Sequence, residues 1–259
     1  MTEPAPLAVT VADGIATVRI DRPARKNAMS VAVFNGLSQT WRELGDDVRV
    51  VVLTSADCGV FSAGLDLKEA AQLKADTGRD ILSFLDDPFQ RAMRRVAVPI
   101  IAAMTGDLFG GGMMLALHCD LRVGLAGTRA GITEAKIGRG SPWGMPLLWM
   151  LPEPIVSELV LVGDLLPIER LHQLGFINHL EPTPDAVRAK AFALARQIAD
   201  NAPLSVAAGK RSIRAGLDRG CEAALDEAEA IYRPVYASED AQEGPRAFAE
   251  KRRPQWKGR

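Results

Sequence analysis

The chain has 259 residues, of which 47% are hydrophobic, 24% charged and 5% aromatic, which is the composition of an ordinary soluble globular protein. Its 31 basic and 32 acidic side chains leave a formal net charge of −1, which excludes the polybasic surface of a protein that binds nucleic acid or an anionic membrane. No apolar run approaches the roughly 18 residues that cross a bilayer, and residues 1–10 lack the basic and apolar regions of a signal peptide, so we expect a cytoplasmic protein with no membrane partner.

Strand and helix patterns alternate along the first 180 residues. Asp13-Gly14 accepts the positive φ of a tight hairpin turn, and Ser30 is a good N-cap residue ahead of apolar side chains at three- and four-residue intervals. This alternation predicts an α/β fold with parallel strand pairing. The predicted elements in chain order are strands at 7–11 and 15–20, a helix at 30–44, a strand at 48–54, a helix at 82–95, a strand at 98–104, a helix at 113–118, a strand at 121–124 and a helix at 153–162.

Beyond residue 184 the strand pattern stops, and the segments 185–200, 203–217 and 221–237 all predict helices. We therefore divide the chain into a core at 1–184 and a helical region at 185–259. The helical region has more large apolar side chains than one face of a monomeric appendage needs, which predicts an oligomer with closed symmetry. These side chains are Phe192, Leu194, Ile198, Leu204, Ile213, Leu225, Ile231 and Tyr232.

Two glycine-centred loops follow predicted strands. Residues 61–67 read FSAGLDL, and residues 106–112 read GDLFGGG just before a helix. Small residues let the backbone come close to a ligand, and free N–H groups at a helix start point toward negative charge, so such loops can build an oxyanion site. Plain turns are an equally common use of glycine loops. Neither loop fits GxGxxG or GxxxxGK[ST], which removes the main support for a nucleotide cofactor.

Other catalytic sequence patterns are missing. The chain has no HExxH and no GxSxG, its three histidines have no metal-ligand spacing, and its three cysteines form no CxxC pair. We therefore predict no metal site and no disulfide framework, and we expect His118 to be a packed histidine. A triad assembled from distant residues stays possible.

One carboxylate, Glu134, stands in a largely small and apolar segment at 130–138, ahead of a Gly/Pro loop at 140–144. Desolvation in such surroundings raises the basicity of a carboxylate and suits it to carry protons. The alternative is a solvated loop glutamate.

Taken together and in order, these segments resemble the crotonase superfamily, also called the enoyl-CoA hydratase/isomerase family, over almost the whole chain. The resemblance implies a crotonase-like spiral of ββα units with two sheets, followed by a helical region that forms a homotrimer or a dimer of trimers. The motifs that carry it are Ile20-Asp21-Arg22-Pro23 with Asn27-Ala28, FSAGLDL, the run GDLFGGGMMLALHCDLRV at 106–123, EAKIG at 134–138 and the C-terminal segment 238–252.

The resemblance also implies binding of an acyl-CoA thioester and stabilisation of its enolate. The oxyanion donors would be the backbone N–H groups of Leu65 and Gly111, and Glu134 would carry the proton. Coenzyme A enters as part of the substrate, and no separate cofactor is expected. The other implied contacts to the acyl group or to CoA are Ala63, Asp66, Arg25, Lys26, Met114, Trp143, Phe248 and Lys251.

One departure from the family pattern concerns the mechanism. Family hydratases have a second glutamate where this chain has Met114, and a PGAGG-like run where it has GSPWG at 140–144. Methionine cannot exchange a proton, so an isomerase-like reaction with Glu134 alone is our leading hypothesis. The alternatives are a hydratase in which another group replaces the missing acid, and an acyl-CoA-binding subunit without turnover. Trp143 would line the acyl pocket or pack structurally.

Overall fold

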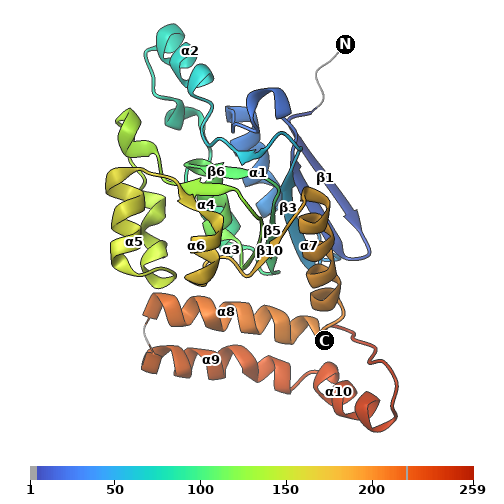
Figure 1. The fold of residues 1–259 in the computed structure, drawn as a ribbon. Coiled ribbons are helices and arrows are strands. Elements are labelled where there is room, and N and C mark those ends of the chain that lie inside the picture. The colour runs from blue at the N-terminus through green and yellow to red at the C-terminus, as the bar shows by residue number, and fades with distance from the viewer. Residues whose placement is uncertain (1–4, 220) are drawn as a thin grey trace.

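The computed structural model describes residues 5–219 and 221–259, without the side chains of 221–228, 242, 245, 248 and 249. It contains a six-stranded sheet in the order β1-β2-β3-β5-β7-β10 and a four-stranded sheet in the order β4-β6-β8-β9 (Figure 1). The strands of the larger sheet are β1 (Leu7–Ala12), β2 (Ile15–Ile20), β3 (Val50–Ser55), β5 (Ile100–Met104), β7 (Leu121–Leu125) and β10 (His179–Glu181). Those of the smaller sheet are β4 (Val60–Ser62), β6 (Asp107–Phe109), β8 (Arg129–Gly131) and β9 (Leu166–Pro167).

The predicted hairpin and parallel pairing are confirmed. β1 and β2 pair antiparallel around Asp13 and Gly14, whose φ angles are 50° and 73°. From β2 onward every pair in the larger sheet is parallel. Parallel strands need helical crossovers, which is why the strand and helix patterns alternate in the sequence.

The chain visits the two sheets in turn. β3 lies in the larger sheet, β4 in the smaller one, and the helix α2 (Leu67–Thr77) follows; β5, β6 and α4 (Gly111–His118) repeat the sequence. β7 and β8 begin a third round, which continues to α5 (Glu153–Ser157). This is the predicted ββα winding. Since β4 and β6 pair in parallel, the loops that follow them emerge side by side.

Several predicted helices are confirmed. The Ser30 side chain accepts a hydrogen bond from the Val33 N–H and caps α1 (Val31–Arg42). The helix predicted at 153–162 is α5 followed by a π-helical turn, Glu158–Val162. The helices of the last third are α7 (Pro184–Ala199), α8 (Pro203–Arg219), α9 (Cys221–Tyr236) and α10 (Glu239–Ala249).

The helix predicted at 82–95 is wrong. The structure has a 3₁₀ turn at Ile81–Phe84 and a short helix, α3 (Arg91–Arg95), with an irregular segment between them. Pro88 explains the break, because it lacks an N–H group and disfavours helical geometry at Asp87. Helix α2 was not predicted, since it buries no residue and its sequence has no clear apolar stripe.

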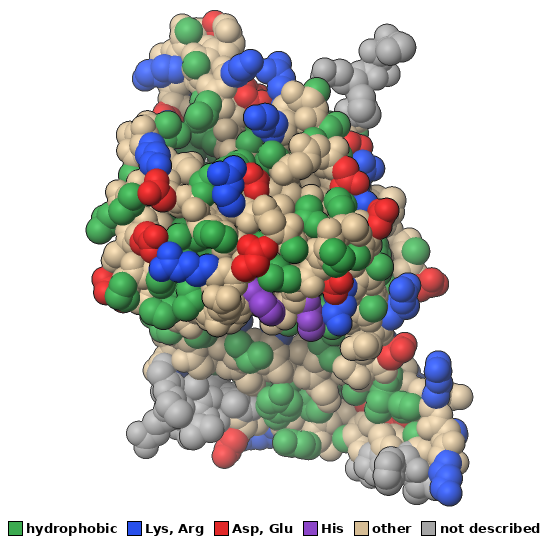
Figure 2. Space-filling model, viewed as in Figure 1, with side chains coloured by type: hydrophobic (Ala, Val, Ile, Leu, Met, Phe, Trp, Pro, Cys, Tyr) green, Lys and Arg blue, Asp and Glu red, His purple; other side chains and the backbone are tan. Residues whose placement is uncertain are grey.

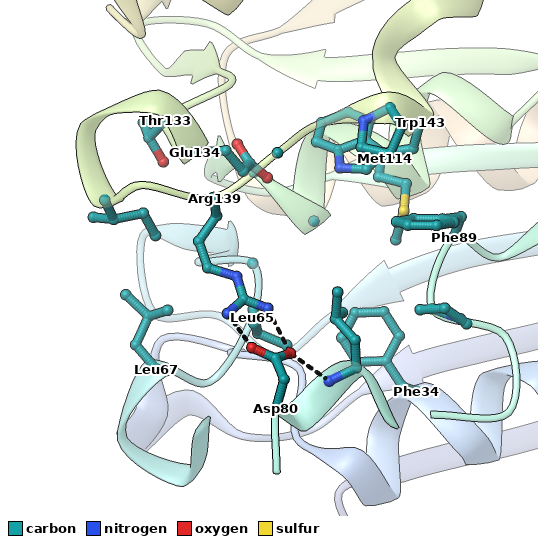
Figure 3. A pocket seen from close by; sticks show the side chains of 18 of the residues that line it. Phe34, Leu65, Leu67, Asp80, Phe89, Met114, Thr133, Glu134, Arg139 and Trp143 are labelled. Atoms are coloured by element: carbon teal, nitrogen blue, oxygen red, sulfur yellow. Dashed lines mark hydrogen bonds and ion pairs between the residues drawn. The ribbon is translucent and has the colours of Figure 1, made fainter. Parts of the chain in front are cut away.

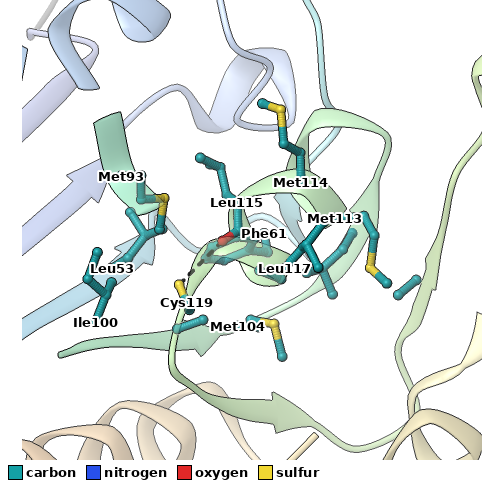
Figure 4. Close-up of a cluster of buried hydrophobic side chains, with 14 of the residues drawn as sticks. Leu53, Phe61, Met93, Ile100, Met104, Met113, Met114, Leu115, Leu117 and Cys119 are labelled. Atoms are coloured by element: carbon teal, nitrogen blue, oxygen red, sulfur yellow. Dashed lines mark hydrogen bonds between the residues drawn. The ribbon is translucent and has the colours of Figure 1, made fainter. Parts of the chain in front are cut away.

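Two apolar clusters hold the core. The larger lies between the sheets and α4, where Leu53, Ile100, Met104 and Leu115 are fully buried (Figure 4). The smaller covers the opposite face of the larger sheet, against apolar residues of α7. All six residues of β3 are buried as a result, as expected for a strand covered on both faces.

The change to an all-helical chain falls where predicted, but α7 packs on the sheet of the core. α8 and α9 form a separate layer beside the core (Figure 1). Lys210 anchors this layer, because its Nζ lies 2.8 Å from the Val98 oxygen and 2.8 Å from Asp120 Oδ2. Within residues 5–219 and 221–259, no helix combines the length and apolar character needed to cross a membrane.

Candidate active site

A pocket of about 430 Å³ opens where the loop after β4, the start of α4 and the segment after β8 meet (Figure 3). It gathers six of the predicted site residues from three distant parts of the chain. These are Ala63, Leu65, Gly111, Met114, Glu134 and Trp143.

Backbone hydrogen bonds hold the first loop, residues 61–67, and leave one of its N–H groups without an acceptor among the described residues. Ala63 N–H donates to the Lys26 oxygen at 3.0 Å, and the Gly64 oxygen accepts from Met29 N–H at 2.7 Å. Asp66 N–H donates to the Met29 oxygen at 3.0 Å. Leu65 and Met29 therefore form a parallel β-bridge, in which Met29 bonds to the residues on either side of Leu65. In this geometry the Leu65 N–H points to the other edge of the strand. In the described part of the chain that N–H donates no hydrogen bond.

The second loop ends at the N-terminus of α4. Gly110 N–H donates to the Gly131 oxygen at 2.9 Å, and Met114 N–H makes the first helical bond, to the Gly110 oxygen, at 3.0 Å. Gly111 is the first residue of the helix, where N–H groups have no intrahelical acceptor and the helix dipole favours negative charge. The Gly111 N–H is therefore a free donor at the pocket wall.

Asn27 holds the base of the first loop. Its buried side-chain amide donates to the Ala56 and Val60 oxygens, both at 2.8 Å, and the Asn27 backbone carbonyl accepts from Ser62 Oγ at 2.9 Å. The Ser62 hydroxyl in turn accepts from Gly64 N–H at 3.2 Å. These bonds fix the loop geometry that leaves the Leu65 N–H exposed to the pocket.

Glu134 lies at the start of a 3₁₀ turn, Glu134–Ile137, and its carboxylate lies against Gly110, where an added Cβ would come 2.8 Å from Oε1. Its Oε2 atom is buried and has no hydrogen-bond partner among the described residues. Burial raises the pKa of Glu134 above its ordinary value of 4.5, partly offset by the backbone N–H groups of Glu134 and Thr133. The carboxylate is therefore a stronger base than a solvated glutamate, which favours the predicted proton carrier over the solvated alternative.

The remaining wall is apolar. Met114, Trp143 and Phe89 lie together across the pocket from the Asp80 and Arg139 side chains (Figure 3). Met114 is 1% exposed and Trp143 8%. Trp143 thus both lines the pocket and packs into the core, so the two alternatives for this residue hold together.

An ion pair crosses the pocket rim. Arg139 Nη1 and Nη2 lie 2.7 and 2.9 Å from the two carboxylate oxygens of Asp80. The guanidinium lowers the pKa of Asp80 to about 2. Sequence reasoning missed both residues, because 59 positions separate them and neither sits in a motif of its own.

The predicted CoA contacts near the N-terminus lie outside the pocket. Arg25 and Lys26 are exposed, but the Lys26 backbone adjoins Ala63 through the bond given above. The Asp66 side chain caps α2 by accepting from Glu69 N–H, and it pairs with Arg22 at 3.0 Å. Asp66 does not line the pocket.

Of the predicted C-terminal contacts, Lys251 also lies outside the pocket. Lys251 follows α10, which Figure 1 places at the far end of the molecule from α2. The side chain of Phe248 is outside the described residues. Among the side chains that the structure describes, no group of three or more His, Cys, Asp or Glu is placed to hold a metal ion.

The sequence and the fold match known proteins over nearly the whole chain. A family profile described as enoyl-CoA hydratase/isomerase matches residues 10–259. An enoyl-CoA hydratase of Mycobacterium tuberculosis is 34% identical over 93% of this chain and 92% of its own length. A carnitinyl-CoA dehydratase of Salmonella arizonae is 35% identical over 94% of this chain and 95% of its own. The crystal structure of an enoyl-CoA hydratase from Bacillus anthracis superposes with a TM-score of 0.91 and 27% identity, covering 98% of this chain and 100% of that one.

Proposed function

The chain belongs to the enoyl-CoA hydratase/isomerase family and has the crotonase fold, and from this premise we propose that it shifts double bonds in enoyl-CoA thioesters faster than it hydrates them. The observation that carries this preference is the composition of the pocket. Its three charged residues among the described side chains are Asp80, Arg139 and Glu134, and the first two neutralise each other. Glu134 is left as the one free carboxylate.

The thioester oxygen binds between the N–H groups of Leu65 and Gly111. Both donors are backbone groups fixed by the bonds of their loops, so they need no reorganisation when negative charge develops on the oxygen. The helix dipole of α4 adds to the attraction at Gly111.

Glu134 carries the proton. Its carboxylate removes a proton from the carbon beside the thioester of a 3-enoyl-CoA, and the electron pair moves onto the thioester oxygen to give a dienolate. The protonated Glu134 then gives the proton to C4, the far carbon of the original double bond, which yields the 2-enoyl-CoA. No other acid or base is needed, and every step uses groups of this chain.

Met114 disfavours hydration. Addition of water to a 2-enoyl-CoA needs one group that orients and deprotonates water and one that supplies the proton to the neighbouring carbon. Met114 can do neither, and its thioether makes this part of the pocket apolar.

The CoA moiety lies over the first loop in this proposal. The Ala63 oxygen accepts from the adenine, and the exposed cations Arg25 and Lys26 contact the phosphates. Lys251 would contact CoA from a neighbouring copy of the chain, because it follows α10, which lies at the opposite end of the molecule from α2, whose first residue, Leu67, lines the pocket.

The chain forms a homotrimer or a dimer of trimers in this proposal, because it has a second exposed apolar surface in addition to that of the helical region. Figure 2 shows hydrophobic side chains on the flank over α5 and on the α8–α9 layer. Ring assemblies need two different complementary surfaces on each subunit. The flank contains Met145, Leu148, Trp149, Leu161 and Val162, which are 45% to 75% exposed. Light scattering should give the mass of three or six chains at micromolar concentration; the mass of one chain would contradict this proposal.

Hydration is the second candidate, because the relatives named above are a hydratase and a dehydratase. The experiment that separates the two supplies short 3-enoyl-CoA and 2-enoyl-CoA in parallel. Chromatography with mass detection distinguishes 2-enoyl-CoA formed without a mass change from 3-hydroxyacyl-CoA, which gains one water. Faster hydration than isomerisation would contradict the proposal, and turnover of neither would contradict both candidates.

A further inference from the structure

We infer that the Asp80–Arg139 ion pair is a positioning device for Glu134, and that Arg139 sets the reactivity of the site without touching the reacting atoms. The inference deepens the proposed function and rests on it for its kinetic test.

No side chain among the described residues fixes the Glu134 carboxylate, since its Oε2 atom has no hydrogen-bond partner and no ion pair to Glu134 is present there. The position of the carboxylate therefore depends on the backbone of the turn that carries it. That turn ends at Gly138, which has φ +66°, and the Arg139 backbone N–H donates to the Glu134 backbone carbonyl at 2.9 Å. Arg139 is thus the residue that closes the turn on Glu134.

The Arg139 side chain then ties this turn to a different part of the pocket wall. Asp80, its bidentate partner, caps the 3₁₀ turn Ile81–Phe84 by accepting from Leu82 N–H at 2.9 Å. Asp80 and Leu82 both line the pocket. One fork of hydrogen bonds therefore sets the spacing between the 3₁₀ turn at Ile81–Phe84 and the turn that carries the base. A planar guanidinium with two parallel bonds fixes orientation as well as distance.

The same turn has a second ion pair on its outer side, which serves as a matched control. Lys136 Nζ lies 2.6 Å from Asp164 Oδ1, and neither residue lines the pocket. Both members are about half exposed, as is Asp80. If the turn needed only some tether, loss of either pair would have the same effect.

The kinetic test compares D80N, R139Q and their double variant with K136Q, using the 3-enoyl-CoA that the parent converts best. A base displaced by about 1 Å can lose on the order of 100-fold in rate, so we expect kcat to fall roughly 10- to 100-fold in D80N and R139Q, with KM within about threefold of the parent. Since the two residues act as a pair, the double variant should lose no more than either single one. R139K, which keeps the charge but not the fork, should recover only part of kcat. K136Q should match the parent.

Two further readouts separate positioning from an electrostatic effect on Glu134 and from a general structural role. The pH midpoint of kcat should not move in R139Q, because burial and backbone groups determine the pKa of Glu134 and Arg139 is not among its causes. Hydrogen–deuterium exchange across residues 133–141 should be faster in D80N and R139Q than in the parent and K136Q, with equal melting temperatures. This second arm needs no turnover, so it still decides the inference if the proposed function fails.

Unchanged kcat and unchanged exchange in R139Q would overturn the inference. So would multiplicative losses in the double variant, or a loss in K136Q equal to that in R139Q.

Discussion

The α-carbon of Gly64 lies against the backbone nitrogen of Gly111. A Cβ on Gly64 would come 2.9 Å from that nitrogen and 2.8 Å from the Phe109 oxygen, and Gly64 has φ +80°. Only glycine allows both the positive φ and this approach. The contact brings the two loops close enough for the N–H groups of Leu65 and Gly111 to face one pocket.

The first prediction tests the Gly111 donor by comparing Gly111→Pro with Gly111→Ala. Both variants add a Cβ that meets Met29 Cε, the end of a flexible side chain. Only proline removes the N–H, and proline is well tolerated at the first position of a helix. We expect kcat of the proline variant to fall about 10²- to 10³-fold below that of the alanine variant. Equal kcat values in two folded variants would show that this N–H is not a donor to the reacting oxygen.

The second prediction concerns Glu134 and pH. Since burial raises its pKa above 4.5, Glu134 takes up a proton at a higher pH than a solvated glutamate. The base must be ionised, so kcat should fall as the pH decreases through this raised pKa, with a midpoint above 4.5. Glu134→Gln should lose at least about 10²-fold in kcat while binding of the CoA thioester stays nearly unchanged. Activity in Glu134→Gln close to that of the parent would assign the base to another residue.

The sequence predicted the elements of the core because their signals are local. The Asp13-Gly14 turn, the Ser30 cap and the buried run that becomes β3 each depend on adjacent residues. Helix α2 buries no residue and so has no apolar periodicity to detect. The helix predicted at 82–95 has suitable spacing, but Pro88 breaks it.

The candidate site was predictable where a role belongs to one position in a motif. Leu65, Gly111 and Glu134 all line the pocket as expected. The Asp80–Arg139 pair was not predictable, since it joins two segments whose proximity follows from the winding of the chain. The pairing of Asp66 with Arg22 was not predictable for the same reason, because the two residues meet only in the folded chain.

The third prediction concerns stability and the buried His118, whose Nε2 lies 3.1 Å from the Phe89 oxygen. Burial lowers the pKa of His118 to about 4 from its ordinary 6.5. Below about pH 6.5 the unfolded chain binds a proton that the folded chain does not bind until about pH 4. His118 therefore contributes stability above pH 6.5 that is lost as the pH falls toward 4.

The check is urea unfolding of the parent and His118→Gln at two pH values. Glutamine can donate to the Phe89 oxygen but does not titrate. Relative to the variant, the parent should lose about 2 kcal/mol of unfolding free energy between pH ~7.5 and pH ~5. A difference between the two proteins that is independent of pH would contradict the burial of a neutral His118.

The last prediction concerns Met114, the residue on which the preference for isomerisation depends. It is nearly fully buried in the pocket wall on α4, so a glutamate there would present a carboxylate to the same cavity as Glu134. The Gly110 N-cap and the start of α4 favour an ionised side chain at this end of the helix. Desolvation opposes ionisation and raises the pKa of a carboxyl group, which suits either an acid or a base near neutral pH.

Met114→Glu should therefore raise the ratio of the hydration rate to the isomerisation rate. The upper limit is the roughly 10²- to 10⁴-fold gain in rate that a positioned acid or base contributes. Met114→Gln is the matched control, because it has the size and polarity of glutamate but cannot exchange a proton. If hydration increased equally in both variants, a more polar pocket that admits water would explain the gain, and the missing second carboxylate would not. A gain confined to Met114→Glu, and lost again when Glu134→Gln is added, would assign hydration to the two carboxylates acting together and the preference of the parent to Met114.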